Sequence, residues 1–281
     1  MRVQRNFMRS GTGDGEVAGP GQRLGKNLDR YCGDVIDVRQ TLAEIISAAD
    51  KHGWERGSFA TTDGFELLSL HRPARSDSPA TRRIYLSAGI HGDEPAGPRA
   101  ALRLLQEDRW PENAELWFCP CLNPVGFTLN CRENARGLDL NRAYLNPSAD
   151  EIIAHINWLE RQPAFDLCLL LHEDWESNGF YLYEQNPLGQ RSLAEPMIDA
   201  VERVCPIDPN ELIEGRPASR GIIRPNLDPD SRPDWPEAFY LIRHKTRLSY
   251  TLEAPSDFAL QVREQALITA VHAALNTFCG F

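Results

Sequence analysis

The sequence contains no apolar run long enough to cross a membrane. Its densest apolar stretch, Leu167 to Leu171, has the length of one β-strand. Arginines occur near the N-terminus, but no apolar segment follows them as a secretory signal requires. We therefore expect a cytoplasmic protein that has no membrane partner.

Basic runs are also missing, and the net charge of the 281 residues is −10. This charge argues against nucleic acid as a partner, although a small anionic substrate stays compatible with it. The seven cysteines are odd in number and irregularly spaced, which fits a reducing compartment better than a disulfide framework. Cys119-Pro-Cys121 has no second cysteine pair at finger spacing, so we interpret it as the end of a buried strand.

The composition is that of a globular protein, with 42% hydrophobic and 25% charged residues. Residues 1–28 are rich in Gly and Arg and show little periodicity, so we predict a poorly ordered N-terminal arm. Residues 29–281 are long enough to form one domain with a full core. Nothing in the pattern specifies an oligomeric state.

Short apolar runs alternate with helical patterns along this domain. The runs predict strands at 65–70, 83–88, 115–119, 166–171 and 248–252, and the helical patterns lie at 42–49, 101–105, 152–159, 197–201 and 260–275. This alternation predicts an α/β fold, with a mixed, mainly parallel twisted sheet and helices on both faces.

Three helix starts are predicted from capping residues, and one long loop from composition. Ser148 and Ser192 each precede a Glu by three residues, the spacing of a capping box, and Ser256 is expected to cap the last helix. Segment 214–237 is rich in Pro, Arg and Asp and has no period, so we predict a long functional loop there.

Three polar residues, His91, His172 and Glu253, follow or finish predicted strands. Ligands bind at the carboxyl ends of such strands, and a histidine and a carboxylate three residues apart, as in His91-Gly-Asp-Glu94, can converge on one divalent ion. The spacing alone is weak, because His52-Gly-Trp-Glu55 repeats it where a helix ends. A loop histidine bonded to a backbone carbonyl is the alternative for His91.

Further motifs follow in a fixed order within a short stretch. They are Asn123-Pro-Val-Gly126-Phe127, Arg132-Glu-Asn134 and Gly137-Leu-Asp139-Leu-Asn141-Arg142, and later Leu171-His172 and Tyr250-Thr-Leu-Glu253. Together with the His91 motif they closely resemble the zinc carboxypeptidase superfamily, over roughly residues 80 to 275. The resemblance implies the zinc carboxypeptidase (phosphorylase/hydrolase-like) fold and one zinc ion.

The resemblance also implies roles for individual residues. His91, Glu94 and His172 would bind zinc, the His₂Glu set of catalytic sites that leave one position open. Asp139 would fix the tautomer of His91 by a hydrogen bond. Asn141 and Arg142 would hold the carboxylate of the substrate. Arg132 would stabilise the developing oxyanion, and Glu253 would be the general base.

Each role has a structural alternative. Glu253 could be a carboxylate paired with an arginine at a strand end, and Asp139 could form a salt bridge with Arg142. His172 stands beside two acidic residues and could belong to a solvated turn. Tyr240 is the nearest candidate for the tyrosine that larger family members place over the substrate.

His91 and His172 lie 81 residues apart, which is a compact spacing. It resembles the small bacterial peptidases, the murein peptide amidases and the succinylglutamate desuccinylase/aspartoacylase branch. We expect a metallocarboxypeptidase that cuts the amide bond next to a free carboxylate in a short peptide or modified amino acid. The alternatives are an N-acyl amino acid deacylase and a catalytically silent zinc-binding protein. In the 214–237 loop, Arg220 or Arg224 is predicted to select an acidic side chain.

Overall fold

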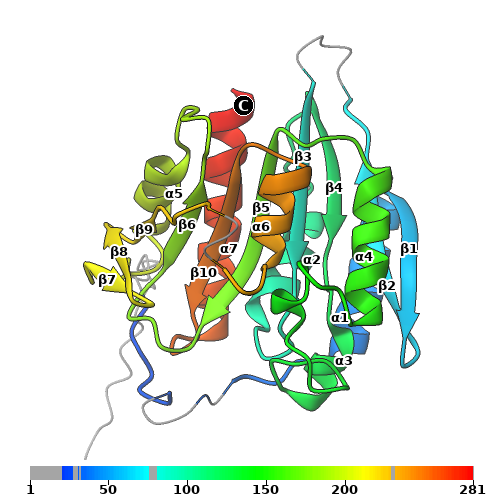
Figure 1. Ribbon diagram of the computed structural model, residues 1–281, viewed down its shortest axis with the longest axis horizontal. Helices are drawn as coiled ribbons and strands as arrows, with labels where there is room; N and C mark the ends of the chain where they lie inside the picture. The colour runs from blue at the N-terminus through cyan, green and yellow to red at the C-terminus, as the bar shows by residue number, and fades with distance from the viewer. Residues whose placement is uncertain (1–20, 28–30, 32, 76–80, 229–231, 281) are drawn as a thin grey trace, which may run out of the picture.

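A mixed sheet runs through the protein in the order β1-β2-β4-β3-β5-β10-β6-β9-β8-β7 (Figure 1). The computed structural model describes residues 21–27, 31, 33–75, 81–228 and 232–280. Within them the strands are β1 (Glu55–Thr62), β2 (Phe65–Arg72), β3 (Arg82–Ala88), β4 (Ala114–Cys119), β5 (Leu167–Asp174), β6 (Tyr181–Gln185), β7 (Leu212–Ile213), β8 (Arg216–Ser219), β9 (Ile222–Ile223) and β10 (Ser249–Pro255).

The centre of the sheet is parallel and its flanks are mostly antiparallel. Strands β4, β3, β5 and β10 run parallel to one another, whereas β1 and β2 on one side and β6 on the other are antiparallel to their inner neighbours. The predicted mixed α/β fold is confirmed. The chain goes from β3 to β4 on one side and returns to β5 on the other, so a topological switch point lies between β3 and β5.

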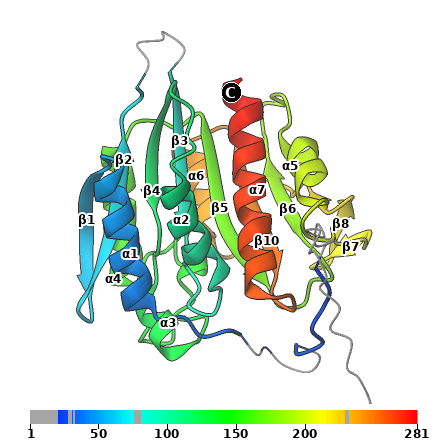
Figure 2. The same ribbon diagram turned by 180° about the vertical axis from the view of Figure 1, so that it is seen from behind.

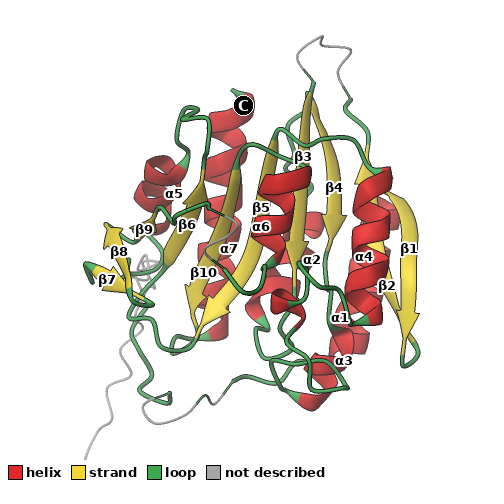
Figure 3. Cartoon of the chain, viewed as in Figure 1, coloured by secondary structure: helices red, strands yellow, loops and turns green. Residues whose placement is uncertain are grey.

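Helices cover both faces of the sheet (Figures 2 and 3). One face carries α1 (Val38–Lys51), α2 (Ala96–Glu107), α5 (Ala194–Val201) and α7 (Leu260–Cys279), and the other carries α4 (Asp150–Arg161) and α6 (Glu237–His244). A short helix, α3 (Pro124–Leu129), and a 3-10 turn, η1 (Leu140–Arg142), lie between β4 and α4.

A large hydrophobic core lies on each face of the sheet. The central strand β5 is buried along almost its whole length, because helices cover both of its faces. Its odd-numbered residues, such as Leu169, pack towards α2 and α7, and its even-numbered residues, such as Leu170, pack towards α4 and α6. His172 has the same parity as Leu170, so the pleat directs both side chains to the α6 face.

All five predicted strands and all five predicted helices are present. The elements that the sequence pattern missed are the exposed strand β1, the short strands β6 to β9, and helices α3 and α6. Segment 214–237 is therefore not one long loop, because β8 and β9 form within it and α6 begins at its end.

The predicted caps are partly wrong. Helix α4 has Ala149 as its N-cap and no side-chain cap bond, so the box at Ser148 does not form. Ser192 does donate to Glu195 over 2.7 Å, although α5 begins only at Ala194. Ser256 caps nothing, because its hydroxyl donates to a buried glutamate on β5.

The N-terminal part of the chain is described from residue 21 onward, with gaps at 28–30 and 32. Residues 1–20 of the predicted arm thus lie outside the described residues, and the division into 1–28 and 29–281 stays a prediction. Residues 21–27 contact the loop after β10, where the Leu24 amide donates to the Asp257 carbonyl over 2.7 Å. No helix in the described part of the chain is long and apolar enough to cross a membrane.

Candidate metal centre and its cavity

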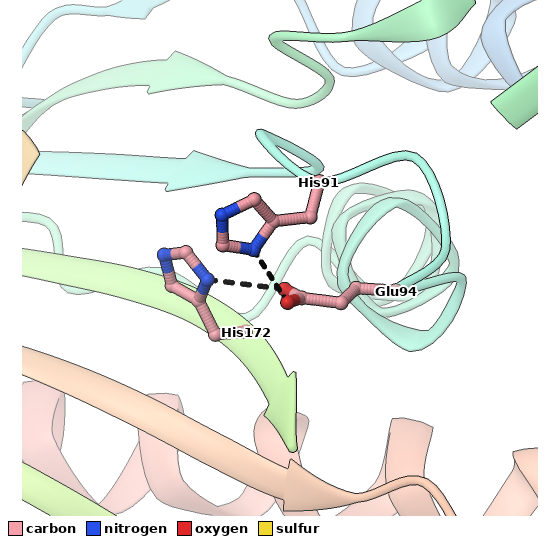
Figure 4. A group of neighbouring side chains, drawn as sticks. All are labelled: His91, Glu94 and His172. Carbon is pink, nitrogen blue, oxygen red and sulfur yellow. Dashed lines mark hydrogen bonds and ion pairs between the residues drawn. The ribbon is translucent and has the colours of Figure 1, made fainter. Parts of the chain in front are cut away.

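Three buried side chains, two from one short loop and one from a strand 78 residues further along the chain, converge at the switch point of the sheet. His91 lies in the loop after β3, Glu94 immediately precedes α2, and His172 lies near the end of β5. The Nδ1 atoms of His91 and His172 lie 2.5 and 3.0 Å from the two carboxylate oxygens of Glu94 (Figure 4). One ligand atom from each residue lies within 4.8 Å of the others, so a single ion can contact all three.

A close approach of two backbones holds the His91 loop in place. Gly92 lies so near Gly126 in α3 that a Cβ on Gly92 would be 2.1 Å from the Gly126 carbonyl carbon. Asn123 caps α3 by accepting from the Gly126 amide over 3.0 Å, which fixes the opposite wall. The Asn-Pro-x-Gly motif therefore positions the loop that carries two of the three converging residues.

The electrostatics of the three groups are coupled. Burial opposes ionisation of Glu94, but His91 and His172 outweigh it and hold the pKa of Glu94 well below its usual range. Burial also opposes protonation of both imidazoles. In His91 the carboxylates of Glu94 and Asp139 prevail and raise its pKa, whereas in His172 burial prevails and the pKa is lowered. An ionised carboxylate beside a neutral imidazole is the protonation state that metal ligands need.

Asp139 contacts the outer nitrogen of His91, whereas Arg132 lies on the inner side, with its Nη1 3.3 Å from His91 Nδ1 and 3.7 Å from Glu94 Oε1. Asp139 Oδ1 lies 3.4 Å from His91 Nε2, and its Oδ2 accepts a hydrogen bond from Arg132 Nε over 2.9 Å. Asp139 is thus paired with Arg132 and not with Arg142, contrary to the structural alternative. Burial raises its pKa, but His91 and Arg132 together lower it far more.

Glu253 faces the same cavity from β10, where it is the register partner of His172 on β5. No side chain in the described part of the protein donates a hydrogen bond to it or forms an ion pair with it, so the alternative of a structural ion pair is not supported. Burial, followed by the nearby carboxylates of Glu94, Glu214 and Asp174, raises the pKa of Glu253 well above its usual value.

Asn141 and Arg142 also line the cavity. Asn141 Oδ1 accepts from the backbone amide of Glu237, at the start of α6, over 2.9 Å. Because its oxygen is engaged there, the amide NH₂ of Asn141 is left as a donor. Arg142 Nη1 donates to the Asn141 carbonyl over 2.9 Å, and its Nε forms a long ion pair with Asp234 at 3.9 Å, which leaves its Nη2 group available.

Behind the cavity wall lies a buried polar network around Glu237. Its carboxylate accepts from Tyr85 over 2.8 Å and from Ser87 over 2.9 Å. The Tyr85 hydroxyl also lies 3.0 Å from His155 Nε2. Burial raises the pKa of Glu237 to about 7, although the two hydroxyl donors oppose this shift.

The cavity has a volume of about 400 Å³ and contains all eight predicted site residues. Its lining also includes residues that the sequence did not single out: Tyr31, Tyr183, Gln185, Glu214, Arg216, Arg232 and Thr251. Tyr240 does not line it, because that ring packs against Tyr144 in the α6 core, so the tyrosine prediction is wrong. The sequence pattern gives no sign that Gln185 and Thr251 belong to the cavity, because both lie on strands and reach it only through the pairing of those strands.

Arg220 and Arg224 are also absent from this cavity, and the prediction that they select the substrate is corrected. Arg220 pairs with Asp199 and Glu202, at the C-terminal end of α5, at 3.0 and 3.4 Å. Arg224 pairs with Glu184 at 2.6 Å and with a glutamate of α5.

Known proteins share both sequence and fold with this chain. Residues 80–195 match the family described as the succinylglutamate desuccinylase/aspartoacylase catalytic domain. A stretch of 161 residues, 48% of this chain, is 32% identical to carboxypeptidase SOL1 from Arabidopsis thaliana. That stretch covers only 32% of the length of SOL1.

Solved structures extend the likeness to most of the chain. A presumed metallopeptidase from Shewanella denitrificans OS217 superposes with a TM-score of 0.75 at 21% identity, over 91% of this chain and 100% of that one. A metallo-carboxypeptidase from Burkholderia cenocepacia superposes with a TM-score of 0.65 at 15% identity, over 87% of this chain and 70% of that one. At these identities the likeness concerns the fold.

Proposed function

We propose, from the premise that this chain belongs to the zinc carboxypeptidase-like superfamily, that it is a zinc-dependent metallocarboxypeptidase. Its substrate would be a short peptide or modified amino acid, cut at the amide bond next to a free carboxylate. The observation that carries the proposal is the convergence of His91, Glu94 and His172 in one cavity with Glu253 and Arg132.

The donor set fits one zinc ion. Two imidazole nitrogens and one carboxylate oxygen are the ligands that catalytic zinc takes when a position is left open for solvent. The pKa of Glu94 is already lowered. Asp139 faces the remaining nitrogen of His91, as a partner that fixes the tautomer does. A zinc ion in this place would supply Lewis-acid polarisation of the scissile carbonyl and acidify the attacking water.

Contacts within the protein support the remaining proposed roles. Glu253 would take a proton from the attacking water and deliver it to the leaving amine; its lack of a hydrogen-bond partner among the described residues and its position beside His172 support this role. Arg132 is fixed by Asp139 and lines the cavity, where it would stabilise the negative charge that develops on the carbonyl oxygen.

Asn141 and Arg142 would hold the free carboxylate of the substrate. The Asn141 NH₂ group and the Arg142 guanidinium are donors, and the partner of the Asn141 oxygen orients the amide. A planar guanidinium with few internal partners suits bidentate binding of a carboxylate. This anchor would place the neighbouring amide bond at a set distance from the metal ligands.

The decisive variant is Glu253→Gln. It should bind one zinc ion as the parent protein does, because residue 253 is not a ligand, and lose hydrolysis by about 10²–10⁴-fold. Glu66→Gln, an exposed glutamate on β2, is the matched control and should keep full activity. Turnover of Glu253→Gln at the parent rate would refute the assignment.

An N-acyl amino acid deacylase is the second candidate, and the family match of residues 80–195 favours it. The metal chemistry would be the same, but the product would be an acyl acid. A panel of C-terminal dipeptides against N-acetyl and N-succinyl amino acids separates the two, because each predicts turnover on its own half of the panel. Bound zinc without turnover of any amide would favour the third candidate, a silent zinc-binding protein.

We also propose a cytoplasmic location and, as partner, a small peptide or N-acyl amino acid substrate, with no nucleic acid and no membrane. The six described cysteines are free thiols, which suits a reducing compartment. The acidic net charge opposes nucleic acid binding. Cell fractionation tests the location.

A further inference from the structure

Glu237 contacts Asn141, which together with Arg142 forms the proposed anchor for the substrate carboxylate. The backbone amide of Glu237 donates to Asn141 Oδ1 over 2.9 Å. The carboxylate of Glu237 accepts from Tyr85 and Ser87 on β3, over 2.8 and 2.9 Å. One buried residue thus links the anchor and the first turn of α6 to the centre of the sheet.

A second set of contacts joins the same parts of the molecule. The Tyr144 hydroxyl lies 2.8 Å from His155 Nδ1, and the Tyr85 hydroxyl lies 3.0 Å from His155 Nε2. The Tyr144 amide donates to the Trp235 carbonyl over 3.2 Å, just before Glu237 in the chain. The contacts therefore close a ring around the start of α6. A change at the Glu237 carboxylate is transmitted to the anchor through this ring.

The Glu237 carboxylate has no cationic partner among the described residues, and it is only 1% exposed. The titratable side chains around it are uncharged at neutral pH, because burial raises the pKa of the thiols and phenols and lowers that of the imidazole to about 3. They are Tyr85 on β3, Cys119 on β4, Tyr144 after η1, His155 on α4 and Cys168 on β5. A negative charge on Glu237 is therefore not compensated.

The charge of Glu237 changes in the neutral pH range. Burial raises its pKa to about 7, although the hydrogen bonds from Tyr85 and Ser87 oppose this shift. A carboxylate bound at Asn141 repels an ionised Glu237 and favours its neutral form, so binding takes up a proton. Conversely, ionisation of Glu237 as the pH rises through 7 weakens the binding of a carboxylate.

We propose that Glu237 is a positioning residue that couples binding of the substrate carboxylate at Asn141 and Arg142 to the uptake of a proton. The inference rests on the proposed function for the place of that carboxylate. It deepens the function by adding a regulation of the same site. The anchor binds a carboxylate strongly while Glu237 is neutral and more weakly once Glu237 is charged.

The test uses 3-phenylpropanoate, a monocarboxylate without an amide bond, which stays ionised from pH 6 to pH 8. It is titrated into the zinc-loaded protein by isothermal calorimetry across this range. The affinity should fall by about 5-fold between pH 6 and pH 8, as expected for two like charges near a protein surface. Titrations in buffers of different ionisation enthalpy measure the protons taken up, which should reach about half a proton near pH 7.5.

Two variants change the charge of Glu237 or the pH at which it appears. Glu237→Gln is neutral at every pH, so it should bind the ligand as the parent does at pH 6. It should also lose the part of the decline centred near pH 7, together with the proton uptake. Tyr85→Phe removes a donor that lowers the pKa of Glu237, so the decline should move to higher pH. This second variant decides the question if Glu237→Gln does not fold.

Other groups of the cavity titrate in a similar range, because burial raises the pKa of Asp93 and of Asp174 to about 6. Both acids remain in Glu237→Gln, so the difference between that variant and the parent reports on Glu237 alone. Glu66→Gln, an exposed glutamate on β2, is the matched control and should keep the parent decline. Zinc affinity should be equal in all four proteins, because none of the variants changes a proposed ligand.

Equal declines and equal proton uptake in the parent and in Glu237→Gln would overturn the coupling, and so would an unshifted profile in Tyr85→Phe. No binding of the ligand at millimolar concentration would overturn the anchor and the coupling together. Calorimetry needs no turnover, so linked proton uptake in a protein that hydrolyses no amide would reject the proposed reaction and keep the role of Glu237. Hydrolysis next to a free carboxylate, with a carboxylate affinity that does not depend on Glu237, would do the reverse.

Discussion

Gly92→Ala is expected to disable the proposed metal centre without changing any of its proposed ligands. The added Cβ would lie 2.1 Å from the carbonyl carbon and 2.3 Å from the Cα of Gly126. Ordinary contact begins at 3.4 Å, so the two backbones must separate by about 1.3 Å, the difference between 3.4 and 2.1 Å. The φ angle of Gly92 is not positive, so the effect is one of packing alone.

The added Cβ is expected to displace the loop of the proposed ligands, because Gly126 on the opposite side is held in place. Gly126 is held by the Asn123 cap, and its carbonyl accepts from Cys131 over 3.1 Å. His91 is the immediate neighbour of residue 92, and Glu94 follows two residues later. A shift of roughly 1 Å at catalytic groups costs on the order of 10²-fold in rate. Overpacking of this kind typically destabilises by about 1–3 kcal/mol.

The assay is a zinc titration of the metal-free protein by calorimetry, together with unfolding in urea. Gly57→Ala on β1 is the control, because its new Cβ would meet only the hydroxyl of Ser69 at 2.9 Å, a group that can rotate away. We expect Gly57→Ala to bind zinc like the parent and Gly92→Ala to bind at least about 10-fold more weakly. Parent-like zinc affinity in Gly92→Ala would show that the tight approach does not position the ligands.

Three further variants test the surroundings of the site. Asp139→Asn should weaken zinc binding by about 10–100-fold in the same titration, because an amide no longer favours the ligating tautomer of His91; unchanged affinity would contradict this. Glu237 has a pKa raised to about 7 from 4.5, so its stabilising effect is fully present below pH 4.5 and is lost as the pH rises through 7. The unfolding free energy of the parent relative to Glu237→Gln should therefore fall by about 3 kcal/mol between pH 4.5 and 8 in urea titrations, and a flat difference would refute it. Arg263→Met should destabilise by about 3–5 kcal/mol because it leaves the buried Glu173 unpaired, and adding Glu173→Gln should restore part of the loss; a double variant no more stable than Arg263→Met would count against this account.

The residues around the metal centre could be found from the sequence because their signals are local. His91 follows a strand that is apolar on both faces, and His172 lies on another such strand. Parallel neighbours bring their carboxyl ends to one edge of the sheet, so the strand pattern alone places both imidazoles together. Glu253 ends a third strand, the direct neighbour of β5.

The missed elements lacked such signals. Strand β1 has an exposed burial pattern, since it is the edge of the sheet and carries no apolar alternation to detect. Ser256 has the residue type of a cap, but Glu173 takes its hydroxyl through a contact between residues 83 positions apart. Local chemistry was outweighed by a tertiary contact in this case.

The choice between arginines in the 214–237 segment is also tertiary. Arg216 faces the cavity because β8 pairs with β9 and β9 pairs with β6, the strand that carries Tyr183. Arg220 lies in the turn after β8, with a positive φ of 51°, and its side chain pairs with Asp199 of α5. Four residues in sequence thus separate a cavity residue from a surface ion pair, and no composition or period distinguishes them.

The site residues that could be predicted from the sequence and those that could not come from different parts of the sheet. The proposed metal ligands and base come from the parallel centre, whereas the cavity residues Arg216 and Arg232 come from the antiparallel edge and from the loop before α6. A backbone hydrogen bond joins that loop to the segment after Asn141 and Arg142, because the Tyr144 amide donates to the Trp235 carbonyl over 3.2 Å. Substitutions on the edge can therefore change the charge that the cavity accepts without touching the proposed metal ligands, which lie on β5 and in the loop after β3. This separation predicts that Arg216→Gln alters ligand preference with no change in zinc affinity, and a coupled loss of both would show that edge and centre act as one unit.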